Sequence, residues 1–199
     1  FYSMRTTTGN SRYSYHINVN NNTLGIFTTS GGFQTISYTF NAGTWYHLAL
    51  VLNTTNTTVY IDGNLVGALG NGMDATKTGM DLGIGSPNDA GYPTEHFPGV
   101  IDELRVWSRE LCEDEIQSRL NCSLDTAGVS GLIAYYDFSN GIANGVNTGI
   151  TTLLDKSGNG HNGTLSSTAL SGMASNWVSQ SDSVSYTSCT AFVSTNIPI

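Results

Sequence analysis

The sequence predicts an all-β protein, an antiparallel two-sheet sandwich with one short helix. Apolar and polar residues alternate over many short segments, which is the pattern of half-buried strands. The composition suits tight turns between such strands, because the 199 residues include 23 Gly and only 11% charged residues. A single interval, residues 113–120, has a helical pattern and is bounded by cysteines.

The first third of the chain contains three alternating segments. They cover residues 13–19, 24–28 and 35–40, and each places apolar side chains at every second position. We expect three half-buried antiparallel strands from this pattern.

The middle of the chain adds a central strand and a hairpin. Residues 45–52 are apolar on both faces, which is typical of a strand covered on both sides. Residues 58–61 and 64–68 flank Asp62-Gly63, a dipeptide suited to the positive φ angles of a tight hairpin turn. A short strand at residues 82–85 follows.

Residues 99–107 are predicted to form a long strand that leads into the helix. In a strand of that length, Asp102 shares a face with apolar side chains, namely Val100, Leu104 and Val106. A bare buried charge is too costly, so this carboxylate must be paired, hydrogen-bonded or bound to a metal.

A second block of the chain begins near residue 131 and ends near Trp177. Beyond Ser181 the chain is rich in Ser and Thr, which is typical of a linker. We therefore expect a β-sandwich over 1–130, trailing strands and a glycine turn over 131–180 that pack on or complete it, and a linker over 181–199.

Three cysteines, Cys112, Cys122 and Cys189, cannot all pair within the chain. If every residue between Cys112 and Cys122 were helical, the two would lie roughly 15 Å apart, beyond the ~7 Å Cα limit of a disulfide. A bridge between them therefore requires the helix to end early. Buried free thiols are the alternative.

Charge and hydropathy exclude two classes of partner. The net charge of −8 and the pI near 4.6 argue against nucleic acid, since phosphate binding needs a clustered basic surface. No apolar run approaches membrane-spanning length, so we expect no membrane insertion. The chain shows no signal peptide and begins with Phe, so we expect it to be an interior piece of a longer protein.

Two stretches carry a family resemblance. The first contains Gly43-Thr44-Trp45-Tyr46-His47-Leu48-Ala49 and Val59-Tyr60-Ile61-Asp62-Gly63-Asn64-Leu65-Val66, and the second runs over residues 97–116. Together they resemble the laminin-G-like (concanavalin A-like, pentraxin-related) jelly-roll domains, which are mostly recognition modules. The resemblance implies a jelly-roll sandwich in an extracellular or cell-surface, bacterial multidomain protein.

The front of the chain departs from that family. Its members usually open with a strand carrying Phe-Asp-Gly and another leading into Ala-Trp-Val, and neither is present. Either the tail strands fill those places, or the sandwich has an open edge. Residues 131–177 resemble the tail that often follows such a module in secreted bacterial proteins.

Catalysis has no residues to support it. Glycosidases of this architecture need two converging carboxylates, and their usual Glu-x-Asp-x-x-Glu strand signature is absent. Asp102 and Glu103 are expected on opposite faces of a strand, while residues 113–115 are acids favoured in the first turn of a helix. We therefore predict that the chain is not an enzyme.

The loop at residues 86–98 is the predicted ligand contact. It is long enough to carry function, and it contains four residues able to stack on a sugar ring or hydrogen-bond its hydroxyls: Asp89, Tyr92, Glu95 and His96. An ordinary solvated loop is the alternative.

A structural Ca²⁺ ion is the predicted cofactor. Asp155-x-Ser157-x-Asn159-Gly160 places oxygen ligands at alternate positions before a turn glycine, like the front half of a calcium loop. Related jelly-roll families often hold calcium with an Asp on the strand that residues 99–107 resemble. The predicted ligands are Asp102, Asp155 and the carbonyls near Asn159 and His161. The alternative is that these Asp side chains accept backbone hydrogen bonds and no metal is present.

The function that follows is recognition. We expect a non-catalytic module that binds glycan or another surface protein in an adhesin-type extracellular protein. The alternatives are an accessory domain of a secreted glycoside hydrolase or other hydrolase, and a structural spacer.

Overall fold

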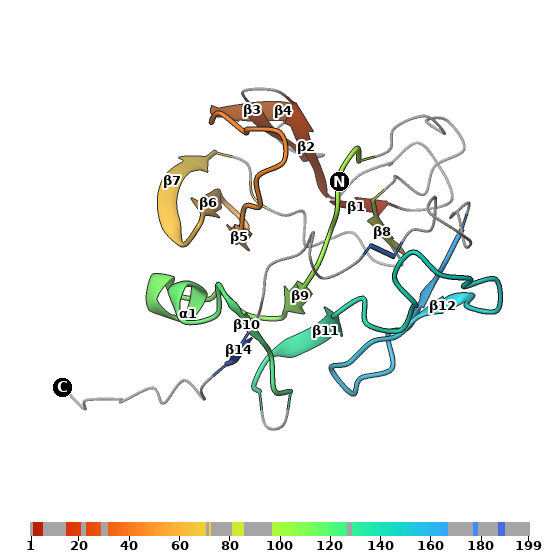
Figure 1. The fold of residues 1–199 in the computed structure, drawn as a ribbon. Coiled ribbons are helices and arrows are strands. Elements are labelled where there is room, and N and C mark those ends of the chain that lie inside the picture. Colours follow the sequence, from red (N-terminus) through yellow and green to blue (C-terminus); the bar gives the residue numbers. More distant parts are fainter. Residues whose placement is uncertain are drawn as a thin grey trace. The chain divides into compact units, whose positions relative to one another are not determined.

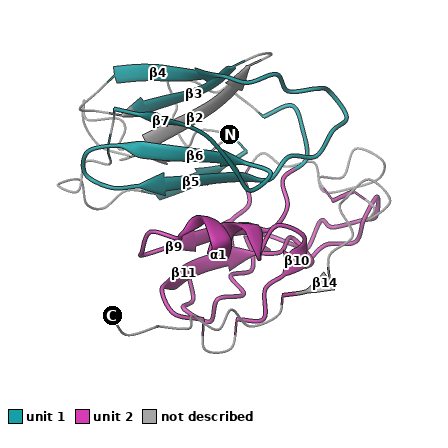
Figure 2. Ribbon diagram, turned by 90° about the vertical axis from the view of Figure 1, so that its left-hand side faces the viewer, with its two compact units in different colours: residues 1–100 teal, residues 101–199 magenta. Residues whose placement is uncertain are grey.

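The computed structural model describes residues 2–5, 15–20, 23–28, 32–70, 72, 81–85, 97–126, 129–166, 177–178 and 187–189. The chain forms two compact units, residues 1–100 and residues 101–199 (Figure 2). The predicted division into a sandwich (1–130), trailing strands (131–180) and a linker (181–199) stays a prediction.

Unit 1 contains a five-stranded antiparallel sheet in the order β4-β3-β2-β1-β8 (Figure 1). Its strands are β1 (Tyr2–Arg5), β2 (Tyr15–Asn20), β3 (Thr23–Thr28), β4 (Gly32–Ser37) and β8 (Asp81–Ile84). The prediction of strands near residues 13–19 and 24–28 is confirmed. The strand predicted at 35–40 begins and ends three residues earlier, so that it includes Phe33.

The second sheet of unit 1 has three antiparallel strands, β5 (Leu48–Leu52), β6 (Thr57–Ile61) and β7 (Asn64–Leu69). The turn between β6 and β7 is the predicted hairpin, with Asp62 at φ 50° and Gly63 at φ 75°. The Asp62 carboxylate also accepts a hydrogen bond from the His47 backbone N–H at 2.8 Å, which ties the turn to the start of β5.

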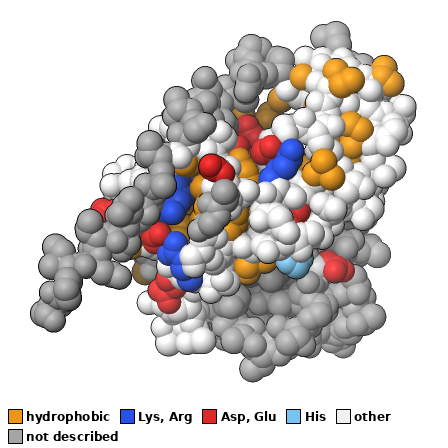
Figure 3. Space-filling model, turned by 90° about the horizontal axis from the view of Figure 1, so that it is seen from below, with side chains coloured by type: hydrophobic (Ala, Val, Ile, Leu, Met, Phe, Trp, Pro, Cys, Tyr) orange, Lys and Arg blue, Asp and Glu red, His pale blue; other side chains and the backbone are white. Residues whose placement is uncertain are grey.

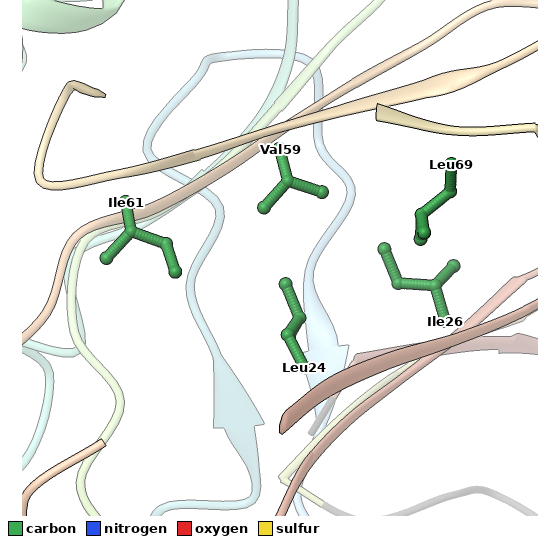
Figure 4. Packing of buried hydrophobic residues seen from close by; sticks show 5 residues of the cluster. All are labelled: Leu24, Ile26, Val59, Ile61 and Leu69. Atoms are coloured by element: carbon green, nitrogen blue, oxygen red, sulfur yellow. The ribbon is translucent and has the colours of Figure 1, made fainter. Parts of the chain in front are cut away.

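The core of unit 1 lies between these two sheets. It contains five buried side chains, from β3, β6 and β7: Leu24, Ile26, Val59, Ile61 and Leu69 (Figure 4). Burying each one contributes about 1.5 to 3 kcal/mol relative to leaving it in water. Gln34 of β4 accepts a hydrogen bond from the Gly70 N–H at 3.1 Å, which joins the edges of the two sheets. The predicted all-β sandwich is confirmed.

Unit 2 is built from short elements. They are β9 (Leu104–Trp107), α1 (Glu113–Gln117), β10 (Cys122–Ser123), β11 (Leu132–Tyr136), β12 (Thr152–Leu153), β13 (Gly163–Thr164) and β14 (Thr187–Ser188). β11 pairs with β9, β12 with β13, and β10 with β14. In unit 2, β11 of the predicted tail therefore pairs with β9, which belongs to the segment that carries the family resemblance.

The strand predicted at residues 99–107 is wrong over its first half. Only Leu104–Trp107 is extended in a sheet, because Glu103 has a left-handed φ of 53° that breaks the alternation of faces. Asp102 is therefore not held on an apolar strand face. Its Oδ1 accepts the backbone N–H of Glu103 at 2.9 Å.

The helix is shorter than the predicted 113–120. α1 begins after Cys112, where Glu115 closes a capping box, and its first turn contains Glu113, Asp114 and Glu115, which the helix dipole favours. After the last helical residue, Arg119 N–H and Leu120 N–H bond to carbonyls three residues back, so the chain tightens and leaves the helix.

The cysteine pairing differs from both alternatives. The disulfide joins Cys122 to Cys189, and Cys112 is a free thiol at the surface. Neither of the two alternatives is found, because Cys122 is not bridged to Cys112 and the free thiol of Cys112 is not buried. Helical spacing could not reveal the true partner, because it lies 67 residues further along the chain.

Candidate functional site

The predicted ligand loop lies almost wholly outside the described residues. Asp89, Tyr92, Glu95 and His96 are among the residues whose placement is not described, so they stay predictions. The ends of the loop do meet, because Gly85 accepts a hydrogen bond from the Phe97 N–H at 2.8 Å.

The turn after β12 uses its polar side chains to hold β11. Asp155 Oδ1 accepts the N–H groups of Tyr135 and Ser157, and Asp155 Oδ2 accepts the Ser157 hydroxyl and the His161 N–H, all within 3.0 Å. Asn159 donates to the Leu132 and Ile133 carbonyls at 2.9 Å. Residues 155–163, which we call the glycine-turn clasp, thus satisfy the free edge of β11.

These contacts bear on the predicted calcium ligands. Both Asp155 oxygens already accept protein hydrogen bonds, and the His161 carbonyl accepts the Tyr136 hydroxyl. Asn159 uses its amide nitrogen toward β11. Within the described part of the chain, no three His, Cys, Asp or Glu side chains are grouped to hold a metal ion. A cation would have to displace these partners, and calcium binding stays a prediction.

Asp102, the remaining predicted calcium ligand, accepts its hydrogen bond from Glu103 and not from the glycine-turn clasp. It is half-buried, and burial raises its pKa to about 6, with a further increase from the neighbouring Glu103 and Asp137 carboxylates. Asp137 accepts the Ser139 N–H and hydroxyl and pairs with Lys156 at 3.7 Å.

Other carboxylates of unit 2 form structural ion pairs. Glu103 accepts hydrogen bonds from the Tyr135 hydroxyl at 2.8 and 2.9 Å and pairs with Arg105. Glu115 is buried, and its carboxylate accepts hydrogen bonds from both terminal guanidinium nitrogens of Arg109, at 2.6 and 2.7 Å. These contacts hold β9, α1 and β11 together.

The outward face of the five-stranded sheet has a different character. Along β4 the side chains alternate strictly, with Phe33, Thr35 and Ser37 exposed while the intervening residues point toward the core. The register sets these three opposite Phe27, Gly25 and Thr23 of β3. We call these six residues of β3 and β4 the outward face.

Phe33 is the centre of the outward face. Its side chain is 57% exposed, more than that of any other aromatic residue whose burial the structure describes. The ring lies over Gly25, because a Cβ added to Gly25 would be 2.2 Å from Phe33 Cζ. Glycine thus seats one side of the ring on the sheet while the side chain remains largely open to solvent.

The outward face carries no formal charge. Residues 13–61, which include β2 through β6, contain no Asp, Glu, Lys or Arg. Hydroxyl groups and aromatic carbon therefore make up the outward face, a combination that can stack on an apolar ring and hydrogen-bond its polar substituents.

Sequence reasoning missed the outward face. The alternation predicts a strand at 35–40, which does not include Phe33, and the close approach of Phe33 to Gly25 is a contact between two strands that the pattern does not indicate. The available signal was a glycine inside a strand pattern, which often marks a close approach by another group.

A family model and a curated protein both match part of this chain. A family model described as the concanavalin A-like lectin/glucanases superfamily matches residues 1–117. An alignment over 111 residues, which covers 51% of this chain, is 31% identical to the sushi, von Willebrand factor type A, EGF and pentraxin domain-containing protein 1 of Rattus norvegicus. The match covers 3% of that rat protein.

A solved structure shares the fold. It is a protein from Bacteroides ovatus to which carbohydrate binding is attributed, with a TM-score of 0.58 and 20% sequence identity. The match covers 86% of this chain and 50% of that protein. Within the described residues, no helix has the length and apolar character needed to cross a membrane.

Proposed function

This chain belongs to the concanavalin A-like lectin/glucanases superfamily, and on that premise we propose that it is a non-catalytic module that binds carbohydrate. The observation that carries the proposal is Phe33, an exposed aromatic ring seated on Gly25 in an uncharged sheet. The fold shared with a protein to which carbohydrate binding is attributed supports the same class of ligand.

The chemistry of a sugar matches the outward face. A pyranose ring has an apolar C–H surface that packs on an aromatic ring, while its hydroxyls need donors and acceptors beside that ring. Thr35 and Ser37 are exposed on the same face of β4 as Phe33, two and four residues further on. The ligand would therefore lie along β4, with stacking at one end and hydrogen bonds at the other.

An extracellular location belongs to the same proposal. The family consists largely of recognition domains, and a disulfide such as Cys122–Cys189 is typical of proteins in an oxidising compartment. The predicted loop residues Asp89, Tyr92, Glu95 and His96 would supply a second contact region. A protein ligand is the second candidate, because an exposed aromatic ring with hydroxyl groups beside it can also contact a protein surface.

The test uses two variants with matched exposure. Leu65 on β7 is also 57% exposed, so Phe33→Ala and Leu65→Ala remove equally exposed apolar groups from different sheets. The full chain is applied to a glycan array, and the affinity for each retained glycan is then measured by calorimetry. We expect Phe33→Ala to weaken binding about tenfold or more, equivalent to about 1.4 kcal/mol, and Leu65→Ala to leave it unchanged.

A third variant tests position rather than chemistry. Gly25→Ala keeps Phe33 but places a methyl group where the ring now lies, so the ring must move while the backbone need not. Binding should fall as for Phe33→Ala. Unchanged binding in both variants, with loss on a Tyr92→Ala, His96→Ala double change, would place the ligand at the loop instead.

A further inference from the structure

The Lys and Arg side chains that the structure describes are each paired with a carboxylate. The chain has seven Lys and Arg residues, and the structure describes the side chains of four of them: Arg105, Arg109, Arg119 and Lys156. Figure 3 shows Lys and Arg groups with Asp and Glu groups beside them. This pattern bears on which glycans the proposed site can accept.

Three of the four cations belong to tight structural networks. Arg105 and Arg119 have side chains only 8% and 12% exposed, paired with Glu103 and Glu115 respectively. Arg109 is 35% exposed, but both of its terminal nitrogens bond to Glu115, in the bidentate arrangement that carboxylates and guanidinium groups prefer. An anionic ligand would have to displace these carboxylates.

Lys156 is the most accessible of the four. Its side chain is 40% exposed, and its Nζ lies 3.7 Å from Asp137 Oδ2. It belongs to the glycine-turn clasp of unit 2, whereas the outward face belongs to unit 1. A single lysine with its own counter-ion does not make a polyanion site, which needs several clustered cations.

The outward face offers no positive charge to an anionic ligand. Residues 13–61 contain no Lys or Arg to balance a carboxylate or sulfate placed over Phe33. The net charge of the whole chain is −8, which adds a general electrostatic cost to binding a polyanion. An acidic glycan would lose hydration on the outward face and gain no ion pair there.

We propose that the module selects uncharged glycans and rejects glycans that carry uronate or sulfate groups. This inference rests on the proposed carbohydrate binding and names the chemical class of the ligand. Recognition uses stacking on Phe33 and hydroxyl hydrogen bonds, both of which are insensitive to ionic strength.

The experiment compares glycan pairs that share a backbone and differ only in charge. The full chain is tested against neutral, sulfated and uronate-bearing members of each pair, at 50 and 500 mM NaCl, with calcium and with chelator. We expect binding to neutral members only, with affinity changing less than about twofold between the two salt concentrations, because an uncharged ligand releases no counter-ions.

Two variants locate the effect. Thr35→Lys adds a cation to the outward face, and Ala68→Lys adds the same charge to an exposed position on β7. Thr35→Lys should gain at least about fivefold in affinity for the acidic members, while Ala68→Lys should gain less than twofold. An equal gain in both variants would show that net charge, not the outward face, controls selection, and would overturn the inference.

The outcomes separate the two proposals. Wild-type binding to acidic members, whether calcium-dependent or lost at high salt, would overturn charge selection and leave carbohydrate binding standing. Binding to no glycan in any condition would overturn carbohydrate binding itself, and the inference would fall with it.

Discussion

Asp102 and Glu115 are carboxylates whose pKa values move in opposite directions. Burial raises the pKa of Asp102 to about 6. The bidentate hydrogen bonds from Arg109 lower the pKa of Glu115 to about 2. The difference is one of partners, since Glu115 has Arg109 and Arg119 beside it, whereas Asp102 has the carboxylates of Glu103 and Asp137 nearby. The free energy of unfolding therefore changes at higher pH for Asp102 than for Glu115.

The Asp102→Asn variant should be more stable than the wild-type protein at neutral pH. Because the pKa of Asp102 is higher in the folded state than the ordinary value of 3.8, the folded chain binds this proton more tightly than the unfolded chain. Its contribution to stability is therefore present at low pH and is lost as the pH rises from about 4 to about 6. Asparagine keeps an oxygen for the Glu103 N–H and removes that loss.

Urea unfolding of both proteins between pH 4 and pH 8 measures this effect. The free-energy difference in favour of Asp102→Asn should grow from pH 4 to pH 6 and then stay constant. The contribution of Glu115 changes at lower pH. Because its pKa is lowered in the folded state, Glu115 stabilises the fold at pH values above its ordinary pKa of 4.5, and this stabilisation is lost as the pH falls toward 2. A difference that shrinks with rising pH would contradict the assignment.

At the scale of elements, β11 depends on side chains from far along the chain. Tyr135 is buried, its N–H is accepted by Asp155, and its carbonyl accepts the Lys156 N–H at 2.7 Å. On its other side β11 pairs with β9. A two-stranded sheet is marginally stable alone, so the glycine-turn clasp acts as a third partner for β11.

Asp155→Ala should loosen β11 specifically. The change leaves the buried Tyr135 N–H without its acceptor, which costs about 1 to 3 kcal/mol. Amide hydrogen exchange should therefore speed up at residues 132–136. Asp137→Ala is the matched control, since it removes contacts to Ser139 and Lys156 but none to the β11 backbone. Equal acceleration in both variants would mean that the clasp has no special role.

At the scale of the whole molecule, unit 2 is closed by a covalent link between distant segments. β10 and β14 form a short parallel ladder, and Cys189 N–H donates to the Ser123 carbonyl at 2.9 Å beside the Cys122–Cys189 disulfide. The 67-residue separation corresponds to a loop-closure contribution of about 4 kcal/mol. Two-residue strands could not hold these segments together on their own.

Cys189→Ser should destabilise unit 2 by about 2 to 4 kcal/mol, the usual range for such a bridge. Cys112→Ser, which alters a free surface thiol, should leave stability within about 1 kcal/mol of the wild type. Denaturant unfolding without and with dithiothreitol checks both changes. Reduction should bring the wild-type protein to the stability of Cys189→Ser, and a wild type insensitive to reductant would contradict a structural role.

Features that depend on local periodicity and local turn chemistry could be predicted from the amino-acid sequence. Alternation at residues 24–28 produced β3, and Asp62-Gly63 produced the hairpin, because side-chain spacing and allowed φ angles are properties of the local chain. The family resemblance over residues 43–66 and 97–116 likewise led to the correct superfamily.

Contacts between distant residues could not be predicted from the sequence and are seen only in the folded chain. Three features show this. Glu103 bends the chain with a left-handed φ, Cys122 pairs with the distant Cys189, and the Phe33 ring packs over Gly25 of the neighbouring strand. The periodicity of the sequence indicates none of them. The same holds for Asp155, whose motif fits both an ion site and a clasp. Its hydrogen bonds to Tyr135 and His161 exist because folding brings β11 to that turn, and a contact between remote segments is a property of the fold rather than of either segment.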